Sequence, residues 1–397
     1  MIYFVVFIYL FFCVIIYDVY EKKRYFMFHY VVLFLFFTLI AGLRWRLGVD
    51  TINYMNSYTY DMVPLSQLSI EYVLDSNYQP FWVLLNSFCK SFGDFTLLQI
   101  LVSSFFHFSV FCFFYQFSKK KFTALAIYFL YKYFYFSMEI MRESLSIACF
   151  LFGIIYLNKN AILKYYLWVL CAFMFHFFSL FLFIIPFVFV NNISLIKKIF
   201  CIISVSFLWL VFKEQILTFF INIVPISIGD KLLKYILSEQ FGSNTWRISG
   251  FLYNLFSLFV IICFSFLCWR KKIIKVFDLK ENIWHGCILL YSIFLILSIN
   301  MAIVMRFSNY MYIIVVLLYS SCLYAVNFNR ISKVVFISIC LFFMFGFRIS
   351  MLMRSERIFD EYKLRIHYYA EFYPYTSVFD KKEPLERKIL HTYWGDK

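Results

Sequence analysis

The chain has 397 residues, of which 63% are hydrophobic and only 15% are charged, with a formal net charge of +15 and a mean hydropathy of +0.79. Soluble domains contain about 45–50% apolar and about 25% charged residues, so this composition excludes an ordinary soluble enzyme. The excess positive charge lies in connections and in the tail, where it predicts membrane topology and anionic partners and excludes nucleic acid as a partner.

Apolar segments along the chain predict an all-α, polytopic membrane bundle of about ten to twelve spans, since a helix needs about 20 apolar residues to cross a bilayer. The predicted spans are residues 2–18, 25–41, 95–117, 122–138, 139–157, 199–215, 248–269, 283–300, 301–326 and 334–350. Residues 165–190 are interrupted by His176. They are predicted to form a hairpin of two short helices, with one tilted span as the alternative. Residues 80–92 are short and mildly amphipathic, which favours an interfacial or re-entrant helix.

Clusters of lysine and arginine predict the orientation. They lie at residues 22–24, 119–121, 159 with 164, 197–198, 270–272, and 330 with 333. If the N-terminus is outside, every one of these clusters lies in the cytoplasm, which agrees with the positive-inside rule for membrane proteins. We therefore expect a multi-pass protein of a bacterial inner membrane, with both the N-terminus and the tail extracytoplasmic. Residues 1–350 would form one membrane domain with large outer loops at 42–94 and 216–247, and residues 351–397 a tail with a short surface helix.

Several arginines fall on the predicted outer side, against the positive-inside rule. They are Arg44, Arg46, Arg142, Arg247, Arg306 and Arg348, and His176 joins them at the tip of the hairpin. Ionisable groups at a helix centre cost at least about 2.5–3.5 kcal/mol, so each needs an explanation. Guanidinium groups stay charged and bind phosphate through two hydrogen bonds at once. The pattern therefore predicts a site for a lipid-linked diphosphate.

Structural alternatives exist for each of these residues. Arg44 and Arg46 can act as membrane-surface anchors beside Trp45, and Arg306 as a headgroup anchor. Arg142 can form a structural ion pair with Glu139 or Glu143. His176 can be a hydrogen-bonded residue that breaks a helix.

The segment after the second predicted span carries a pattern that resembles a known family. It has the form Arg, then Gly-x-Asp-x-x-x-Tyr, at Arg46, Gly48, Asp50 and Tyr54. Further blocks in the same order are residues 79–86, 141–148, 156–159 and 164–179, and Arg306 with Tyr310. Together they resemble the EpsG-type family of bacterial polysaccharide polymerases, related in role to Wzy-type O-antigen polymerases. The chain departs from the family at Gln79, where Glu is frequent, and at Glu143, where Gln is frequent.

The resemblance implies a GT-C-like membrane transferase. Such an enzyme would polymerise undecaprenyl-diphosphate-linked oligosaccharide units into O-antigen or related surface polysaccharide at the periplasmic face, by inverting glycosyl transfer. The partners would be the lipid-linked donor and acceptor glycans, membrane lipids and a chain-length regulator protein. The outer loops carry no DxD-like metal signature, so we expect neither a metal nor another cofactor.

Roles for individual residues follow from the resemblance and from their chemistry. Arg46 and Arg142, together with Arg44 and Arg306, would bind the diphosphates. Asp50 or His176 would accept the proton from the attacking hydroxyl, with Glu139 as a further candidate base. Asn53 and Tyr54 would orient sugar hydroxyls.

Two other functions would use the same lipid-linked unit. An O-antigen ligase transfers it to a different acceptor. A flippase or transporter moves it across the membrane, and such proteins carry charges along a path to both sides, with internal repeats. In this chain the unexplained charges gather on one predicted side and no repeat is visible, so a polymerase is favoured.

Overall fold

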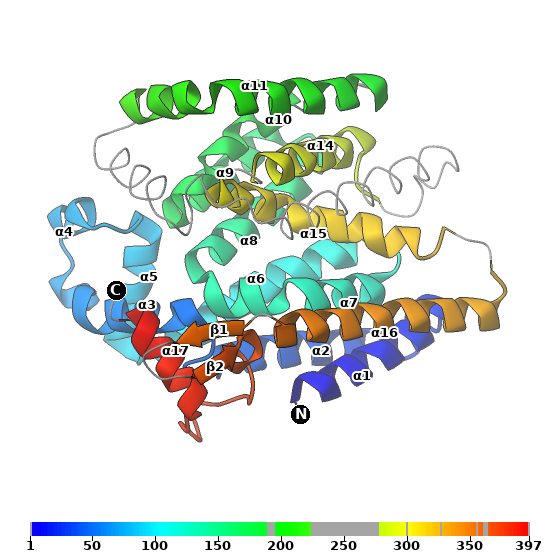
Figure 1. Cartoon of the computed structure of the whole chain (residues 1–397), viewed down its shortest axis with the longest axis horizontal. Coiled ribbons are helices and arrows are strands. Elements are labelled where there is room, and N and C mark those ends of the chain that lie inside the picture. The colour runs from blue at the N-terminus through cyan, green and yellow to red at the C-terminus, as the bar shows by residue number, and fades with distance from the viewer. Residues whose placement is uncertain are drawn as a thin grey trace. The chain divides into compact units, whose positions relative to one another are not determined.

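A computed structural model describes residues 2–188, 195–223, 278–298, 301–325, 328–354, 356–359 and 364–395. The chain divides into two compact units, which are described separately. The first unit contains Met1–Leu180 and Val326–Lys397, and the second contains Phe181–Ala325. The described residues of both units are mainly helical (Figure 1).

The long helices of the first unit follow the apolar segments of the sequence. They are α1 (Ile2–Cys13) with the π-helical turn η1 (Val14–Val19), α2 (Phe26–Gly42), α6 (Phe95–Phe117), α7 (Lys121–Tyr131) with the π-helical turn η4 (Tyr135–Glu139), α8 (Met141–Asn158), α9 (Ile162–Phe175) and α16 (Arg330–Arg354). Shorter helices between α2 and α6 are α3 (Val49–Asn56), η2 (Ser57–Asp61), η3 (Leu65–Gln67), α4 (Ile70–Asp75) and α5 (Pro80–Phe92). An all-α fold with several apolar helices is therefore confirmed.

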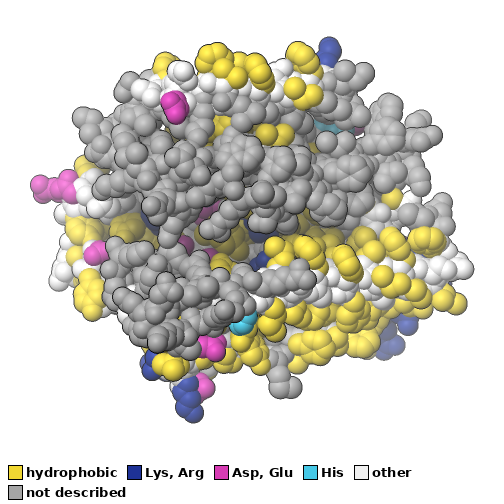
Figure 2. Space-filling model, viewed as in Figure 1, with side chains coloured by type: hydrophobic (Ala, Val, Ile, Leu, Met, Phe, Trp, Pro, Cys, Tyr) yellow, Lys and Arg dark blue, Asp and Glu magenta, His cyan; other side chains and the backbone are white. Residues whose placement is uncertain are grey.

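Four helical segments in the described ranges are long and apolar enough to cross a membrane: Ile2–Val19, Phe95–Phe117, Met141–Asn158 and Arg330–Met353. Shorter apolar helices accompany them, among them Phe26–Gly42 and Glu281–Leu297. Hydrophobic side chains are exposed along α1 and α16, among them Phe12 and Phe343. Figure 2 shows hydrophobic side chains gathered on one face of the protein. Exposed apolar faces of this kind suit contact with lipid. The total of ten to twelve spans stays a prediction, and the predicted span 248–269 lies outside the described residues.

One end of the first unit gathers two of the basic clusters. Lys120 forms an ion pair with Glu21 at 2.7 Å, and its ammonium also donates to the Asp18 carbonyl. Asp18 in turn accepts from the backbone N–H of Thr123 at 2.6 Å, in the first turn of α7. A carboxylate at that position satisfies a free amide and complements the positive end of the helix dipole. Residues 22–24 and 119–121 thus share one end of the unit.

The tail is more structured than the predicted surface helix. Strands β1 (Glu356–Phe359) and β2 (Leu364–His367) pair antiparallel, and η9 (Tyr368–Glu371) and α17 (Leu385–Gly395) follow. A small apolar cluster joins β2, η9 and α17. The predicted helix is present as α17, which packs against α3, whereas β2 and η9 pack against α16.

The second unit contains α10 (Ile185–Val188), α11 (Leu195–Ile223), α14 (Glu281–Leu297), η7 (Ala302–Val304) and α15 (Met305–Cys322). Helices α14 and α15 pack together, with Phe294 and Phe307 stacked at 5.3 Å between ring centres. Helix α11 extends further in both directions than the predicted span 199–215. The 3-10 turn η5 (Phe177–Ile184) leads from the first unit into the second.

Candidate functional site

The candidate site lies in the first unit where the start of α8, the start of α5, the end of α9 and helix α3 meet. A buried apolar cluster joins these elements and includes Trp82 of α5 and Met141 of α8. Tyr54, Tyr78 and Phe175 pack against that cluster. The residues that carry chemistry sit at its edge, each next to one of these anchoring side chains. The apolar cluster therefore fixes the geometry of the site.

Arg142 occupies the first turn of α8, next to the buried Met141. Its guanidinium carbon lies 5.0 Å from the ring centre of Tyr78 and 6.0 Å from that of Tyr54. Its Nη1 donates to the Gln79 side-chain oxygen at 3.4 Å, and its buried Nε has no hydrogen-bond partner. Arg142 forms no ion pair with Glu139 or Glu143, so the structural alternative for this arginine is wrong.

The surroundings of Arg142 favour an anion. A helix N-terminus carries partial positive charge from its free amides, and the guanidinium adds a full charge to it. Tyrosine rings orient a cation without neutralising it. No carboxylate among the described residues offsets that charge by an ion pair to Arg142. The site can therefore accept a phosphate group.

Helix α3 brings two more predicted residues toward this point. Asp50 and Tyr54 are four positions apart, so they share one face of α3, and the Tyr54 ring is the one that faces Arg142. Asn53 is exposed on the same helix. The start of α3 is fixed by Thr51, whose hydroxyl donates to the Met138 carbonyl at 2.9 Å. Asp50 is thereby held beside the residues that lead into α8.

The backbone conformation and close packing at position 48 explain why the residue there is a glycine. Its φ of +87° is a conformation that side chains disfavour, and a Cβ at this position would lie 2.8 Å from the Met138 carbonyl oxygen and 3.2 Å from Cγ of Glu139. Glycine therefore allows the start of α3 to contact the segment before α8 directly. Glu139 itself is buried at this contact.

His176 lies at the end of α9, where it ends the helix in an extended conformation. This confirms the predicted break at His176. The Ser146 hydroxyl donates to the Ala172 carbonyl at 2.9 Å, and Arg142 and His176 each lie one helical turn beyond that contact, toward the same end. The neighbouring Phe175 packs on Phe81 of α5, 5.5 Å between ring centres. Arg142 and His176 are thus brought to the same end of the α8–α9 pair.

Arg44 and Arg46 are placed differently from Arg142. Arg44 is 1% exposed and donates to the carbonyls of Ala41 and Met138. Burial lowers its pKa to about 10, which still leaves the guanidinium charged at neutral pH. Its position favours a structural role. Arg46 is 40% exposed and forms an ion pair with Glu383 of the tail at 2.8 Å.

Three further arginines were predicted on the outer side, at positions 247, 306 and 348. Arg306 begins α15 in the second unit, so its contribution stays a prediction. Arg247 lies outside the described residues. Arg348 lies in the second half of α16 and interacts electrostatically with Lys132.

Two residues that contact Arg142 were not predicted as site residues. They are Tyr78 and Gln79, and Gln79 stood out only as a departure from the family. Lys132 lies inside the predicted span 122–138, at the break between α7 and η4, and interacts electrostatically with Glu143. A lysine inside an apolar span is itself a signal that could have identified it.

Apolar helices, four of them in the described ranges long enough to cross a membrane, define an integral membrane protein. The chain belongs to the EpsG family, whose model matches residues 27–377. This confirms the resemblance based on the motif blocks. The family consists of glycosyltransferase-like polysaccharide polymerases, and membership indicates a polymerase-type function in polysaccharide biosynthesis. The comparisons with curated proteins and with solved structures gave no match.

Proposed function

We propose that this protein polymerises undecaprenyl-diphosphate-linked oligosaccharide repeat units into O-antigen or a related surface polysaccharide. The reaction takes place at the periplasmic face of a bacterial inner membrane. The observation that carries the proposal is Arg142, a partly buried cation at a helix N-terminus that contacts tyrosine rings and an amide and forms no ion pair. A bound diphosphate would supply the negative charge that pairs with the Arg142 guanidinium.

The proposed chemistry is an inverting displacement. A hydroxyl at the non-reducing end of the acceptor unit attacks the anomeric carbon of the donor chain. The new glycosidic bond forms as the bond from that carbon to the diphosphate oxygen breaks, and the lipid diphosphate leaves with the electron pair. The hydroxyl proton passes to Asp50 or His176.

Arg142 stabilises the charge that develops on the leaving diphosphate, which is the step where a fixed cation lowers the barrier most. Tyr54 and Tyr78 hold the guanidinium in place. Asn53, exposed one position before Tyr54 on α3, orients a sugar hydroxyl. Arg46 and Arg306 contribute to binding the two diphosphates, and a chain-length regulator is a partner in the cell. The mechanism requires no metal ion.

The test uses purified protein and a synthetic lipid-diphosphate repeat unit, with products separated on gels. Wild-type protein is expected to produce a ladder of polymers, also in the presence of a chelator. Arg142→Lys and His176→Ala should shorten or abolish the ladder, whereas Arg330→Lys, an exposed arginine at the start of α16, should not. Full-length ladders from both site variants at normal protein levels would remove these residues from the mechanism. Transfer only to an unrelated acceptor would indicate a ligase.

A further inference from the structure

The loop of residues 43–48, which joins α2 to α3, is held by the tail. The backbone N–H of Trp45 donates to the Thr376 carbonyl at 2.9 Å, and that of Val378 donates to the Leu43 carbonyl at 3.0 Å. The Thr376 hydroxyl donates to the Trp45 carbonyl at 2.6 Å. The loop and the tail are thus paired like two short strands, although more than 300 residues separate them in the sequence.

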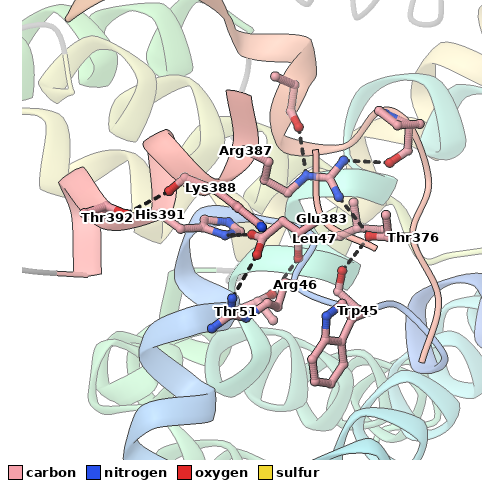
Figure 3. A network of polar contacts seen from close by, with 12 residues as sticks. Trp45, Arg46, Leu47, Thr51, Thr376, Glu383, Arg387, Lys388, His391 and Thr392 are labelled. Carbon is pink, nitrogen blue, oxygen red and sulfur yellow. Dashed lines mark hydrogen bonds and ion pairs between the residues drawn. The ribbon is translucent and has the colours of Figure 1, made fainter. Parts of the chain in front are cut away.

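Arg387 locks the tail in this conformation. It is 0% exposed and donates three hydrogen bonds: to the Ala370 carbonyl at 2.9 Å, to the Pro374 carbonyl at 2.6 Å and to the Thr376 hydroxyl at 2.8 Å. Figure 3 shows its guanidinium among these acceptors, beside the Trp45 contact. Burial lowers the pKa of Arg387. A buried cation satisfied by neutral acceptors serves to fix chain segments in place.

Glu383 links the same tail to Arg46. One carboxylate oxygen accepts from Nη1 of Arg46 at 2.8 Å, and the other contacts Nδ1 of His391 in α17 (Figure 3). The Glu383 side chain is only 4% exposed, whereas that of Arg46 is 40% exposed. Burial alone raises the pKa of Glu383, but its hydrogen bonds to His391 and Arg46 outweigh burial and bring the pKa below its ordinary value. Glu383 is therefore ionised and fixed.

The ion pair with Glu383 leaves one edge of the Arg46 guanidinium available for a further hydrogen bond. Its Nη1 is taken by Glu383, and Nη2 has no protein partner among the described contacts. Arg46 has φ +50°, a left-handed conformation that is uncommon outside glycine and that the paired loop maintains. Lys381 of the tail lies over the neighbouring Trp45, 5.0 Å from its ring centre.

We propose that Glu383 is a positioning residue, which orients Arg46 so that its free Nη2 edge binds a phosphate of the lipid-linked substrate. The proposal rests on the proposed polymerase function. Glu383, Arg387 and His391 all lie beyond residue 377, where the family match ends.

The test compares Glu383→Gln with Glu386→Gln, an exposed glutamate of α17, in the purified polymerisation assay. Arg46 contributes binding, so loss of its anchor should raise KM by about tenfold and leave kcat nearly unchanged. A purely structural effect would instead reduce the amount of active protein, and with it the apparent kcat at constant KM. Glu386→Gln should change neither constant.

A double-mutant cycle completes the test. In an Arg46→Ala background, Glu383→Gln should cause no further rise in KM, because the group it positions is gone. Additive effects, or an unchanged KM in Glu383→Gln, would overturn this inference while the polymerase function stands. Wild-type protein that makes no polymer from the lipid-linked unit would overturn the polymerase function and this inference together.

Discussion

Two regions of the first unit use arginine in opposite ways. In the loop and tail, Arg44 and Arg387 are buried and donate to backbone carbonyls and hydroxyls, and Arg46 is paired with Glu383. At the start of α8, Arg142 has two tyrosine rings, one weak amide contact and a buried Nε without a partner. A buried Nε without a partner is common to Arg44, Arg46 and Arg142 and does not separate the two regions. Arg44 and Arg387 each donate to several acceptors within the protein, whereas Arg142 donates to a single, weak one.

This difference separates structure from function among arginines that look alike in the sequence. A buried cation that donates to several acceptors within the protein contributes to folding. A cation held by aromatic rings at a helix N-terminus keeps its capacity for an outside anion. Removing an arginine from the two regions should therefore affect different measurements.

The largest effect is expected from Arg142→Ala. Loss of the cation facing the leaving diphosphate should lower kcat by about 10²–10³, the usual consequence of removing one group that stabilises charge in the transition state. The thermal unfolding midpoint in detergent should stay close to that of the wild type. A large fall in that midpoint with kcat preserved would place Arg142 with the structural arginines.

Arg387→Ala should show the reverse pattern. It leaves two carbonyls and the Thr376 hydroxyl without their donor, which should reduce the free energy of unfolding by about 2–4 kcal/mol. The measurement is thermal unfolding in detergent, followed by proteolysis of the tail. Arg387→Lys should rescue only part of the loss, since a lysine cannot make the same three bonds. If the tail of Arg387→Ala stays resistant to protease, Arg387 does not have the structural role assigned to it.

Gly48→Ala tests the contact between the two regions. The positive φ and the approach of Met138 should make alanine cost about 1–3 kcal/mol of stability. Gly346→Ala is the matched control, since a Cβ there meets nothing within 4 Å and a helical alanine is favoured by up to about 1 kcal/mol. Equal unfolding midpoints for the two variants would show that the close approach at Gly48 does not exist.

The smallest effect is expected from Tyr78→Leu, which removes one ring from Arg142. A cation–π contact is worth about 0.5–2 kcal/mol, so kcat with the lipid-linked unit should fall by a few-fold, and Tyr78→Phe should restore it. The control is Tyr25→Leu, an exposed ring that contacts Arg24 near the opposite end of the unit. The same fall in both leucine variants would show that Tyr78 does not act through Arg142.

Much of the fold was predictable because apolar runs and caps define helices locally. Residues 95–117 match α6 at both ends, where Asp94 accepts from the Thr96 amide at 2.9 Å, and residues 80–92 match α5, which begins at Pro80. The predicted span 122–138 was less accurate, because α7 ends at Tyr131 and Lys132 occupies the break.

The candidate site was only partly predictable. The motif identified Gly48, Asp50 and Tyr54 because their spacing is local, and Arg142 stood out separately as an arginine on the predicted outer side. The pair Arg46 and Glu383 is separated by 337 positions, and no periodicity connects such distant residues. Sequence alone also could not distinguish the buried Arg44 from the half-exposed Arg46 two positions later, since burial is set by the tail that folds over them.

The central claim is that Arg142 binds a lipid-borne diphosphate, and direct binding of undecaprenyl diphosphate tests it most directly. Native mass spectrometry of the purified protein should show that wild type and Arg330→Gln bind this lipid equally well. Arg142→Gln should bind it about 10- to 100-fold more weakly, as expected for loss of a charge-assisted contact. Equal affinity of Arg142→Gln and wild type for the diphosphate lipid would contradict the account.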